Sequence, residues 1–470
     1  MSMIKHDKIF INGEWVTPSS SETIEVENPA NKEIIGSVPA CKEEDVNRAV
    51  EAAKEAFKTW QYTPLDERIK LTKELVDELR LRVDDMTDII VKELGAPTEY
   101  AKKTHVLPYL DDIENFIKIM GDYPLEETFD GYSVVREPIG VVGALTPWNF
   151  PFGQITKKLA PALLSGSTIV IKPSQNTPLV SYILAEAIDK VGFPAGVFNL
   201  VPGKGSDVGN PLAQHPDVNL ITFTGSTDGG REVSKLAYDD IKRVTLELGG
   251  KSPVIILKDA DLDVALFNVL NSIYSNTGQA CSAFSRLLVP REDKEKIEKM
   301  IVDRTKSYIF GDPTDPETRM GPLASKKQFF KVKYYVERGI DEGAKVLLGE
   351  VPEESDGYYV DPVVFTDVDN DMEIAREEIF GPVLSIIPYD TVEEAIEMAN
   401  DNKYGLMSGV FGPNDEVLDV ARQIKAGGVV VNDGTRTHAA PFGGYKHSGV
   451  GREGGKYGLD EFFQIKTLYI

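Results

Sequence analysis

A cysteine among small and polar residues could act as a nucleophile. Cys281 lies in the segment "NTGQACSAFSRL", whose small side chains leave room for a substrate. A thiolate attacks carbonyl carbon readily. The alternative is a buried structural thiol, which is the usual state of free cysteine and our interpretation of Cys41. The loop composition favours the nucleophile at Cys281.

A carboxylate inside an apolar segment could act as a general base. Glu247 lies in "LELGGKSPVIIL", just before Gly249 and Gly250. Burial would raise the pKa of this carboxyl, as suits a base working near neutral pH. The two glycines would let the backbone bend and the side chain move. The alternative is an ion pair with a lysine such as Lys251.

Three other segments carry polar groups suited to binding anions. Asn149, between two prolines in "TPWNFP", could donate to a developing oxyanion or could only form a turn. "FTGSTDGGREV" places Gly225 and Ser226 between a strand and a helix, and "VPGKGSDVG" contains Gly205 and Gly209. A strand, glycine-rich turn and helix can present backbone N–H groups to a phosphate. Neither segment has GxGxxG spacing, so each signal is weak by itself.

Strands and helices that alternate along the chain must position these residues. Residues 8–17 predict a hairpin around Asn12-Gly13, and residues 43–119 have helical periodicity. From residue 141 to about 430, apolar strands alternate with helices, which is typical of parallel sheets covered on both faces. A Thr cap, Thr177, is expected before the helix in "TPLVSYILAEAIDKVG". The last residues, "DEFFQIKTLYI", predict an exposed strand that pairs with something, often another subunit.

The bulk composition excludes several classes of function. The 470 residues carry 51 Lys plus Arg against 75 Asp plus Glu, a net charge of -24, so nucleic-acid binding is not expected and any anionic ligand must be held by local groups. Two cysteines and five scattered histidines form neither a disulfide framework nor a metal motif. No signal peptide and no apolar run of membrane-spanning length is visible. We expect a soluble cytoplasmic protein that binds neither metal nor membrane.

Several rare strings, taken together and in order, resemble the aldehyde dehydrogenase superfamily. They are "TPWNFP", "IKPS", "FTGST", "LELGGKSP", "GQAC", "EEIFGPV" and "PFGGYKHSGVGRE", and the resemblance covers essentially the whole chain. It implies an α/β fold with a Rossmann-like cofactor domain (1–121 and 139–249), an α/β catalytic domain (250–450) and a small β oligomerisation arm (122–138 and 456–470). It also implies an aldehyde substrate, NAD as cofactor and a homodimer or homotetramer.

The resemblance implies a role for each matching residue. Cys281 is the nucleophile, Glu247, 34 residues upstream, is the general base, and Asn149 forms an oxyanion hole with the Cys281 amide. Lys158 and Glu453 resemble a proton relay behind Glu247. Lys172 is expected at the adenosine ribose, Ser226 at the pyrophosphate, Glu378 at the nicotinamide ribose and Phe380 beside the ring. The cofactor-binding residues expected in full are Trp148, Lys172, Gln175, Gly205, Gly209, Gly225, Ser226, Glu378 and Phe380.

Some positions depart from the pattern of the relatives. Gln175 stands where many NAD-preferring relatives carry Glu, so we expect mainly NAD use with NADP tolerated. Gln464 stands where several relatives have Glu bonded to arginines, so Arg243 and Arg452 should be less fully neutralised here, with the subunit interface retained.

The substrate channel and the acyl acceptor are less well defined by the sequence. Gln154 and Lys157 replace residues that are often apolar, and His438 would border the mouth, which weakly favours a substrate with a polar or acidic distal end. Glu247 favours water as the acyl acceptor over coenzyme A, the rival within enzymes. A non-catalytic relative would have lost the nucleophile or the base, and both are present.

Overall fold

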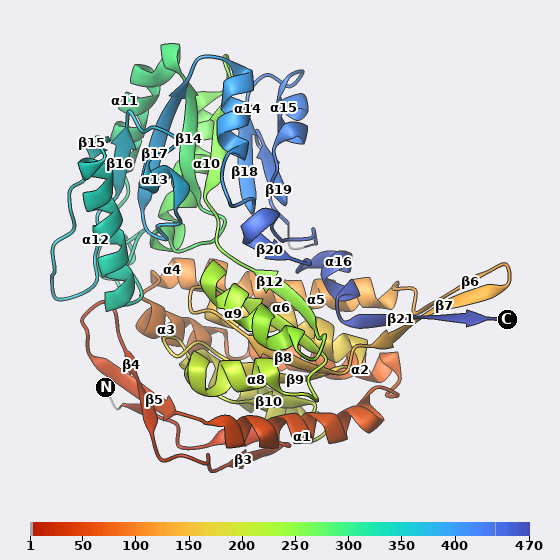
Figure 1. Ribbon diagram of the computed structural model, residues 1–470. Helices are drawn as coiled ribbons and strands as arrows, with labels where there is room; N and C mark the ends of the chain where they lie inside the picture. Colours follow the sequence, from red (N-terminus) through yellow and green to blue (C-terminus); the bar gives the residue numbers. More distant parts are fainter. Residues whose placement is uncertain (1–2, 438) are drawn as a thin grey trace.

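The computed structural model describes residues 3–437 and 439–470 and contains four β-sheets (Figure 1). The largest has eight strands in the order β20 (Gly449–Val450), β12 (Arg243–Glu247), β11 (Leu220–Thr224), β8 (Val141–Leu145), β9 (Thr168–Lys172), β10 (Phe198–Leu200), β2 (Ile9–Ile11) and β3 (Glu14–Val16). Its central strands, β9, β8, β11 and β12, run parallel. Phe10 pairs with Trp15 in an antiparallel hairpin, which confirms the prediction for residues 8–17.

Helices flank this sheet, as the periodicity predicted. The N-terminal helical region comprises α1 (Glu43–Trp60), α2 (Leu65–Arg80), α3 (Val83–Leu94), α4 (Thr98–Tyr100), the π-helix η1 (Ala101–Val106) and α5 (Leu107–Gly121). The helices that alternate with the parallel strands are α6 (Pro151–Ser165), α7 (Leu179–Val191), α8 (Asn210–Gln214) and α9 (Thr227–Tyr238). A three-stranded sheet of β1 (Ile4–Lys5), β5 (Ile34–Pro39) and β4 (Thr23–Glu27) lies beside the N-terminus.

The second large sheet has seven strands, drawn in the upper part of Figure 1. Its order is β15 (Lys345–Leu348), β16 (Val363–Thr366), β17 (Val383–Tyr389), β14 (Phe284–Pro290), β13 (Ser252–Ile256), β18 (Met407–Phe411) and β19 (Gly428–Val431), parallel except for β15. Its helices are α10 (Leu262–Tyr274), α11 (Lys294–Thr305), α12 (Lys326–Asp341), α13 (Glu373–Arg376), α14 (Val392–Asn400) and α15 (Val417–Gln423).

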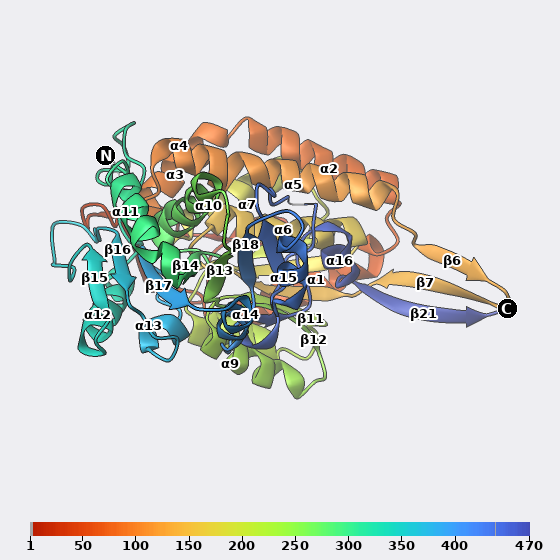
Figure 2. The ribbon, with the colours of Figure 1, turned by 90° about the horizontal axis from the view of Figure 1, so that it is seen from above.

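The last sheet forms an arm that projects from the body in both views (Figures 1 and 2). It joins β6 (Glu126–Phe129), β7 (Tyr132–Pro138) and the C-terminal β21 (Phe463–Tyr469), which follows α16 (Gly455–Asp460). β21 pairs with β7 of the same chain from Phe463 opposite Pro138 to Tyr469 opposite Tyr132. The predicted terminal strand is therefore confirmed, and one of its edges is paired within this chain.

Two local details differ from the sequence expectations. The cap expected from Thr177 is wrong: its hydroxyl donates to the Trp148 carbonyl, and the first amides of α7 donate instead to the buried Glu93 carboxylate on α3. β20 lies in the segment expected to be catalytic, yet it pairs with β12 of the eight-stranded sheet. The exact domain boundaries stay a prediction.

Candidate active site

The candidate residues gather where the parallel strands of the eight-stranded sheet end. From β8 the chain moves outward through β9 and β10, then returns to the other side of β8 with β11 and β12. In α/β sheets, ligands bind at the carboxyl ends of the strands where the strand order reverses in this way. Register places Lys172 beside Leu145, just before the Asn149 loop, and Thr224 beside Glu247.

The loop that carries Cys281 is hydrogen-bonded to the loop that carries Asn149. The Asn276 side-chain amide donates to the Asn149 carbonyl at 2.8 Å, and the Asn149 amide donates to the Gln279 carbonyl at 3.1 Å. Asn276 and Thr277 have φ of 51° and 57°, a left-handed conformation that non-glycine residues rarely adopt. The strained turn and its bonds bring two predicted residues, Asn149 and Cys281, to one place.

The Cys281 backbone lies close to the start of β13. At Gly250 a Cβ atom would overlap the Cys281 carbonyl oxygen, so glycine is required for this approach. Among the described residues, none accepts a hydrogen bond from the Cys281 amide, and only one N–H of the Asn149 amide is used. Two donors therefore remain available beside the thiol.

The electrostatic environment keeps the Cys281 thiol protonated in this structure. Burial, followed by the nearby carboxylates of Glu247 and Glu378, raises its pKa to about 12, against opposing effects of Arg436 and Lys157. A thiol in this state needs a proton acceptor when it reacts.

Glu247 ends β12 as a buried carboxylate with 3% of its surface exposed. Within the described part of the chain, neither carboxylate oxygen has a hydrogen-bond partner. The alternative of an ion pair with Lys251 is wrong, because the Lys251 ammonium is also without a hydrogen-bond partner there. Burial, and then the charge of Glu453, raise the pKa of Glu247 well above its ordinary value. A buried carboxyl with a raised pKa and no partner is suited to act as a base, and that role of Glu247 stays a prediction.

A second buried carboxylate lies behind Glu247 and is bonded through one of its two oxygens. Glu453 forms an ion pair with Lys158, whose side chain is 1% exposed, and Lys158 also donates to the Thr224 hydroxyl at 2.7 Å. Burial favours a higher pKa for Glu453, but Lys158 and Lys157, together with hydrogen bonds, lower its pKa below the ordinary value. We call Glu247, Lys158, Glu453 and Thr224 the site floor.

The residues predicted to hold the phosphates and ribose lie at the end of β9 and at the start of α9. Ser226 caps α9 by accepting from the Gly229 amide at 3.2 Å, and a Cβ at Gly225 would lie 2.5 Å from the Phe223 ring. Burial lowers the pKa of Lys172 to about 8. A Cβ atom at Gly209 would lie 3.8 Å from the aliphatic part of the Lys172 side chain.

Two other predicted residues on this side are more exposed. Gln175 is exposed, and a Cβ at Gly205 would meet nothing within 4 Å, so packing does not require glycine there.

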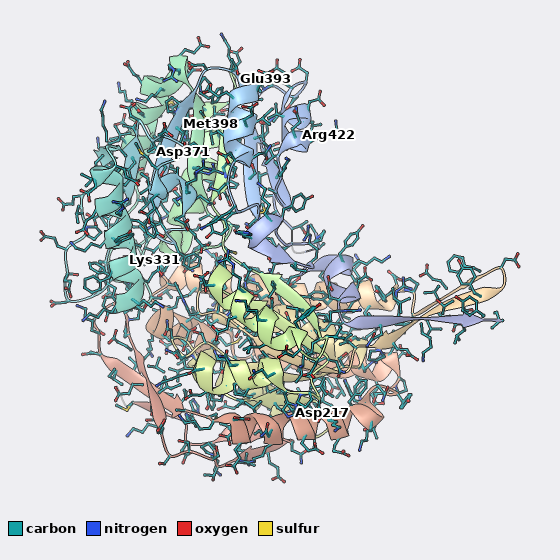
Figure 3. All side chains as sticks on the ribbon, viewed as in Figure 1. Asp217, Lys331, Asp371, Glu393, Met398 and Arg422 are labelled. Carbon is teal, nitrogen blue, oxygen red and sulfur yellow. The ribbon has the colours of Figure 1, made fainter. Side chains whose placement is uncertain are left out.

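The predicted nicotinamide side contacts the start of β13. Glu378 accepts from the Gly250 amide at 3.0 Å, and a Cβ at Gly249 would lie 2.6 Å from its carboxylate. Burial raises the pKa of Glu378, while Lys331 on α12, labelled in Figure 3, opposes this shift. Phe380, at a φ of 61°, meets the Trp148 ring edge-on at a centroid distance of 5.4 Å.

Sequence reasoning missed some of the residues that hold the site together. Thr224 and Asn276 bond directly to predicted residues, and their positions beside Gly225 and in "NTGQAC" were the available signals. In the described residues no ion pair joins the guanidinium of Arg243 or Arg452 to a carboxylate, in line with the expectation for Gln464. Arg243 donates to the carbonyls of Glu461 and Phe463 at 3.0 and 2.6 Å rather than to the side chain of residue 464.

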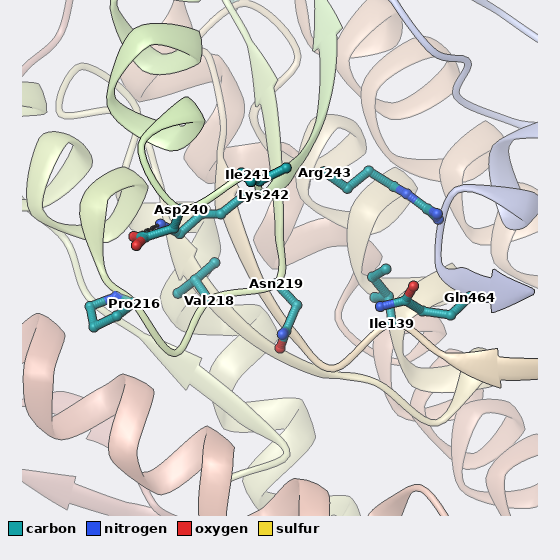
Figure 4. A pocket seen from close by; sticks show the side chains of 9 residues that line it. All are labelled: Ile139, Pro216, Val218, Asn219, Asp240, Ile241, Lys242, Arg243 and Gln464. Atoms are coloured by element: carbon teal, nitrogen blue, oxygen red, sulfur yellow. Dashed lines mark hydrogen bonds and ion pairs between the residues drawn. The ribbon is translucent and has the colours of Figure 1, made fainter.

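Figure 4 shows where Arg243 and Gln464 lie. Both line a surface pocket of about 390 Å³, and no interaction joins them. The Arg452 amide donates to the Glu461 carboxylate at 3.3 Å. The Arg452 guanidinium itself donates to the Gly444 and Gly451 carbonyls.

The described residues contain neither a membrane-spanning helix nor a cluster of metal ligands. None of the helices in residues 3–437 and 439–470 is long and apolar enough to cross a membrane. The same residues contain no cluster of three or more His, Cys, Asp or Glu arranged to hold a metal ion. His438 lies outside the described residues, so its expected place at the mouth stays a prediction.

Comparison with known proteins identifies the family. The Aldehyde dehydrogenase family profile matches residues 15–468. A Staphylococcus saprophyticus protein, provisionally named an aldehyde dehydrogenase, is 47% identical over 465 residues, covering 98% of each chain. These matches agree with the Rossmann-like sheet and show that the chain belongs to the aldehyde dehydrogenase family.

Solved structures agree with this assignment. A Pseudomonas syringae aldehyde dehydrogenase C mutant, in complex with NAD+ and octanal, superposes with a TM-score of 0.97 at 40% identity, covering 98% of this chain and 96% of that one. A Mycobacterium tuberculosis aldehyde dehydrogenase in complex with NAD+ gives a TM-score of 0.97 at 41% identity, covering 100% and 99%. The predicted α/β fold class is confirmed.

Proposed function

We propose that this protein oxidises an aldehyde to the carboxylic acid with NAD through a cysteine-bound acyl intermediate. The observation that carries the proposal is the meeting of three groups: the Cys281 thiol, the bonded Asn149 loop and the unpaired buried Glu247. Each would do a different part of the chemistry. Membership of the aldehyde dehydrogenase family supports the reaction class.

The residues of the chain would act in sequence. Glu247, whose pKa is raised, accepts the Cys281 proton as sulfur attacks the aldehyde carbon. The remaining Asn149 N–H and the Cys281 amide donate to the oxygen, which becomes negative in the thiohemiacetal. After oxidation the acyl group is held on Cys281 as a thioester. Glu247 would first pass the Cys281 proton to solvent through the relay proposed for Glu453 and Lys158. It then removes a proton from water, which attacks the thioester and releases the acid.

NAD, when bound, supplies the hydride acceptor that the oxidation requires. Lys172, Ser226 and the glycine turn at Gly225 would hold its adenosine and phosphate portion, and Glu378 with Phe380 would hold the nicotinamide end. The space kept by Gly249 beside Glu378 fits this role. The NAD+ complexes of two structural neighbours support it.

The assay that tests this proposal is a panel of aldehydes with NAD, followed by the absorbance of the reduced cofactor. Cys281→Ala should abolish turnover, whereas Cys41→Ala, at the other cysteine, should keep the parental rate. Equal rates for the parent and Cys281→Ala would refute the mechanism. Acyl-CoA formation on adding coenzyme A would show that the thioester is passed to CoA, against the role given to Glu247.

The choice of cofactor is a separate test. Gln175 is a neutral residue where a carboxylate would repel a 2′-phosphate, so NADP should be used less well than NAD but measurably. A preference for NAD above about 10⁴-fold in kcat/KM, or roughly 5.5 kcal/mol, would contradict the tolerance of NADP. A cytoplasmic location and a homodimer or homotetramer joined through the β6–β7–β21 arm complete the proposal.

A further inference from the structure

Two cations meet at an aromatic ring next to the nucleophile. Arg436 donates to the Ser282 hydroxyl at 2.9 Å, and Ser282 directly follows Cys281. The Arg436 guanidinium lies 5.3 Å from the Phe442 ring centroid, and the Lys157 ammonium lies 5.1 Å from the same centroid. Both charges therefore approach one ring beside the thiol. We call Arg436, Lys157, Phe442 and Tyr109 the site mouth; Tyr109 contributes its ring, 5.8 Å from Lys157.

Neither cation is neutralised by an ion pair in the described part of the chain. Arg436 contacts a hydroxyl and a ring, and Lys157 contacts two rings. Of the acids nearby, Glu453 is already paired with Lys158. Lys157 acts on two further carboxyls: it opposes the burial that raises the pKa of Asp112 to about 6, and it lowers the pKa of Glu247. No ion pair joins either cation to a carboxylate in the described residues, and Arg436 is exposed, so a positive charge faces solvent here in a chain whose net charge is -24.

A buried polar side chain lies one turn before Lys157 on α6. Gln154 lies three residues before Lys157 on α6, and residues three apart share a helix face. Its side chain is 6% exposed, and its carbonyl oxygen has no hydrogen-bond partner among residues 3–437 and 439–470. An alkyl chain extending past Lys157 and Arg436 would offer these two cations no counter-charge, whereas a carboxylate would.

We propose that the mouth selects aldehydes whose far end carries a carboxylate, bound by Arg436 with help from Lys157. This inference rests on the proposed aldehyde oxidation and names its substrate class. The guanidinium presents paired N–H donors that match a carboxylate, and its contacts with Ser282 and Phe442 hold it beside the reacting sulfur. The octanal in one structural neighbour has no such group, so the two enzymes would differ in substrate.

The test compares straight-chain aldehyde acids with their uncharged primary amides, chain length by chain length, at saturating NAD. The parent should prefer the best acid over its amide by about 10-fold or more in kcat/KM, mainly through KM. Arg436→Gln should bring that preference to within about 2-fold while the amide is still oxidised. Arg436→Lys should keep part of the preference for the acid, because the lysine retains the positive charge but lacks the paired N–H donors of the guanidinium.

The outcomes of this test distinguish failure of the substrate preference from failure of aldehyde oxidation. Arg422→Gln removes an exposed arginine of α15, paired with Asp419 and labelled in Figure 3, and should change nothing. No acid preference in the parent, or a preference that survives in both Arg436→Gln and Lys157→Met, would overturn the inference and leave aldehyde oxidation standing. Failure to oxidise any aldehyde would remove both proposals. If Arg436→Gln does not fold, Arg436→Lys and Lys157→Met decide.

Discussion

The site floor and the site mouth use adjacent lysines of α6 for different purposes. Lys158 points into the floor, where it is almost fully buried and joined to Glu453 and Thr224. Lys157 points to the mouth, where it lies over the rings of Tyr109 and Phe442 with no carboxylate bonded to it in the described residues. The same side-chain type thus balances a buried charge in one region and leaves a positive charge to be used in the other.

The difference shows how burial decides the task of a charge. In the floor, a buried ion cannot be left without a partner, so Lys158 is committed to Glu453. Glu247, which lacks such a partner, has its pKa raised. In the mouth, partial exposure lets a cation remain unpaired at low cost. Catalysis would therefore depend on the floor and substrate choice on the mouth.

The largest expected effect is on the unpaired base of the floor. Glu247→Gln should lower steady-state turnover by about 10²–10⁴-fold, because an amide cannot take a proton from water. Mass spectrometry should then show acyl groups accumulating on Cys281 during turnover. The exposed α14 variant Glu393→Gln serves as a control with parental rate. A slow variant with no acyl-enzyme would mean that the loss falls on the attack step, in which Glu247 accepts the Cys281 proton, and not on hydrolysis.

The next effect concerns the oxyanion donor that lies between floor and mouth. Asn149→Ala should reduce kcat by about 10²–10³-fold, the usual cost of one lost oxyanion-hole donor. The loss should be similar for acid and amide substrates, because Asn149 would contact the reacting oxygen and not the far end. A loss confined to the acids would place Asn149 in substrate selection instead.

A smaller effect is expected on the pH dependence of hydrolysis. Lys158 lowers the pKa of both Glu247 and Glu453, and Glu247 must be ionised to act as a base. Hydrolysis should therefore rise with pH through the pKa of Glu247, and Lys158→Met should move this rise to higher pH. The double variant Lys158→Met with Glu453→Gln removes both buried charges and should move it less. A shift to lower pH would contradict the claim that Lys158 lowers the pKa of Glu247.

The smallest effect is expected when the mouth lysine is removed. Lys157 also lowers the pKa of Glu247, but less than Lys158 does. Lys157→Met should move the pH profile in the same direction by a smaller amount and also weaken the preference for aldehyde acids. A pH shift larger than that of Lys158→Met would erase the distinction between the two regions.

Much of the fold could be predicted because it depends on local patterns. The alternation of apolar residues revealed the hairpin and the parallel strands, and the rare strings located Cys281, Glu247 and Asn149. These features are encoded by residues close together in sequence.

Features that depend on distant contacts were not predicted. Glu93 caps α7 from 86 residues away, so the nearby Thr177 was the wrong choice. Arg243 donates to the backbone carbonyls of Glu461 and Phe463, and no local sequence pattern marks backbone groups as the partners of an arginine. The place of Arg436 depends on how its loop folds over Ser282, and no local pattern records that contact.

The length of α6 before its two lysines has a consequence for how this enzyme can change. Successive residues of an α-helix project about 100° apart, and Pro151 sets where the helix begins. Inserting or deleting a single residue between Pro151 and Lys157 would rotate one lysine out of the ion pair with Glu453 and the other away from Phe442. Substitutions at the site mouth can therefore change the substrate preference. A change in the length of this stretch of helix would instead remove both the ion pair with Glu453 and the contact with Phe442.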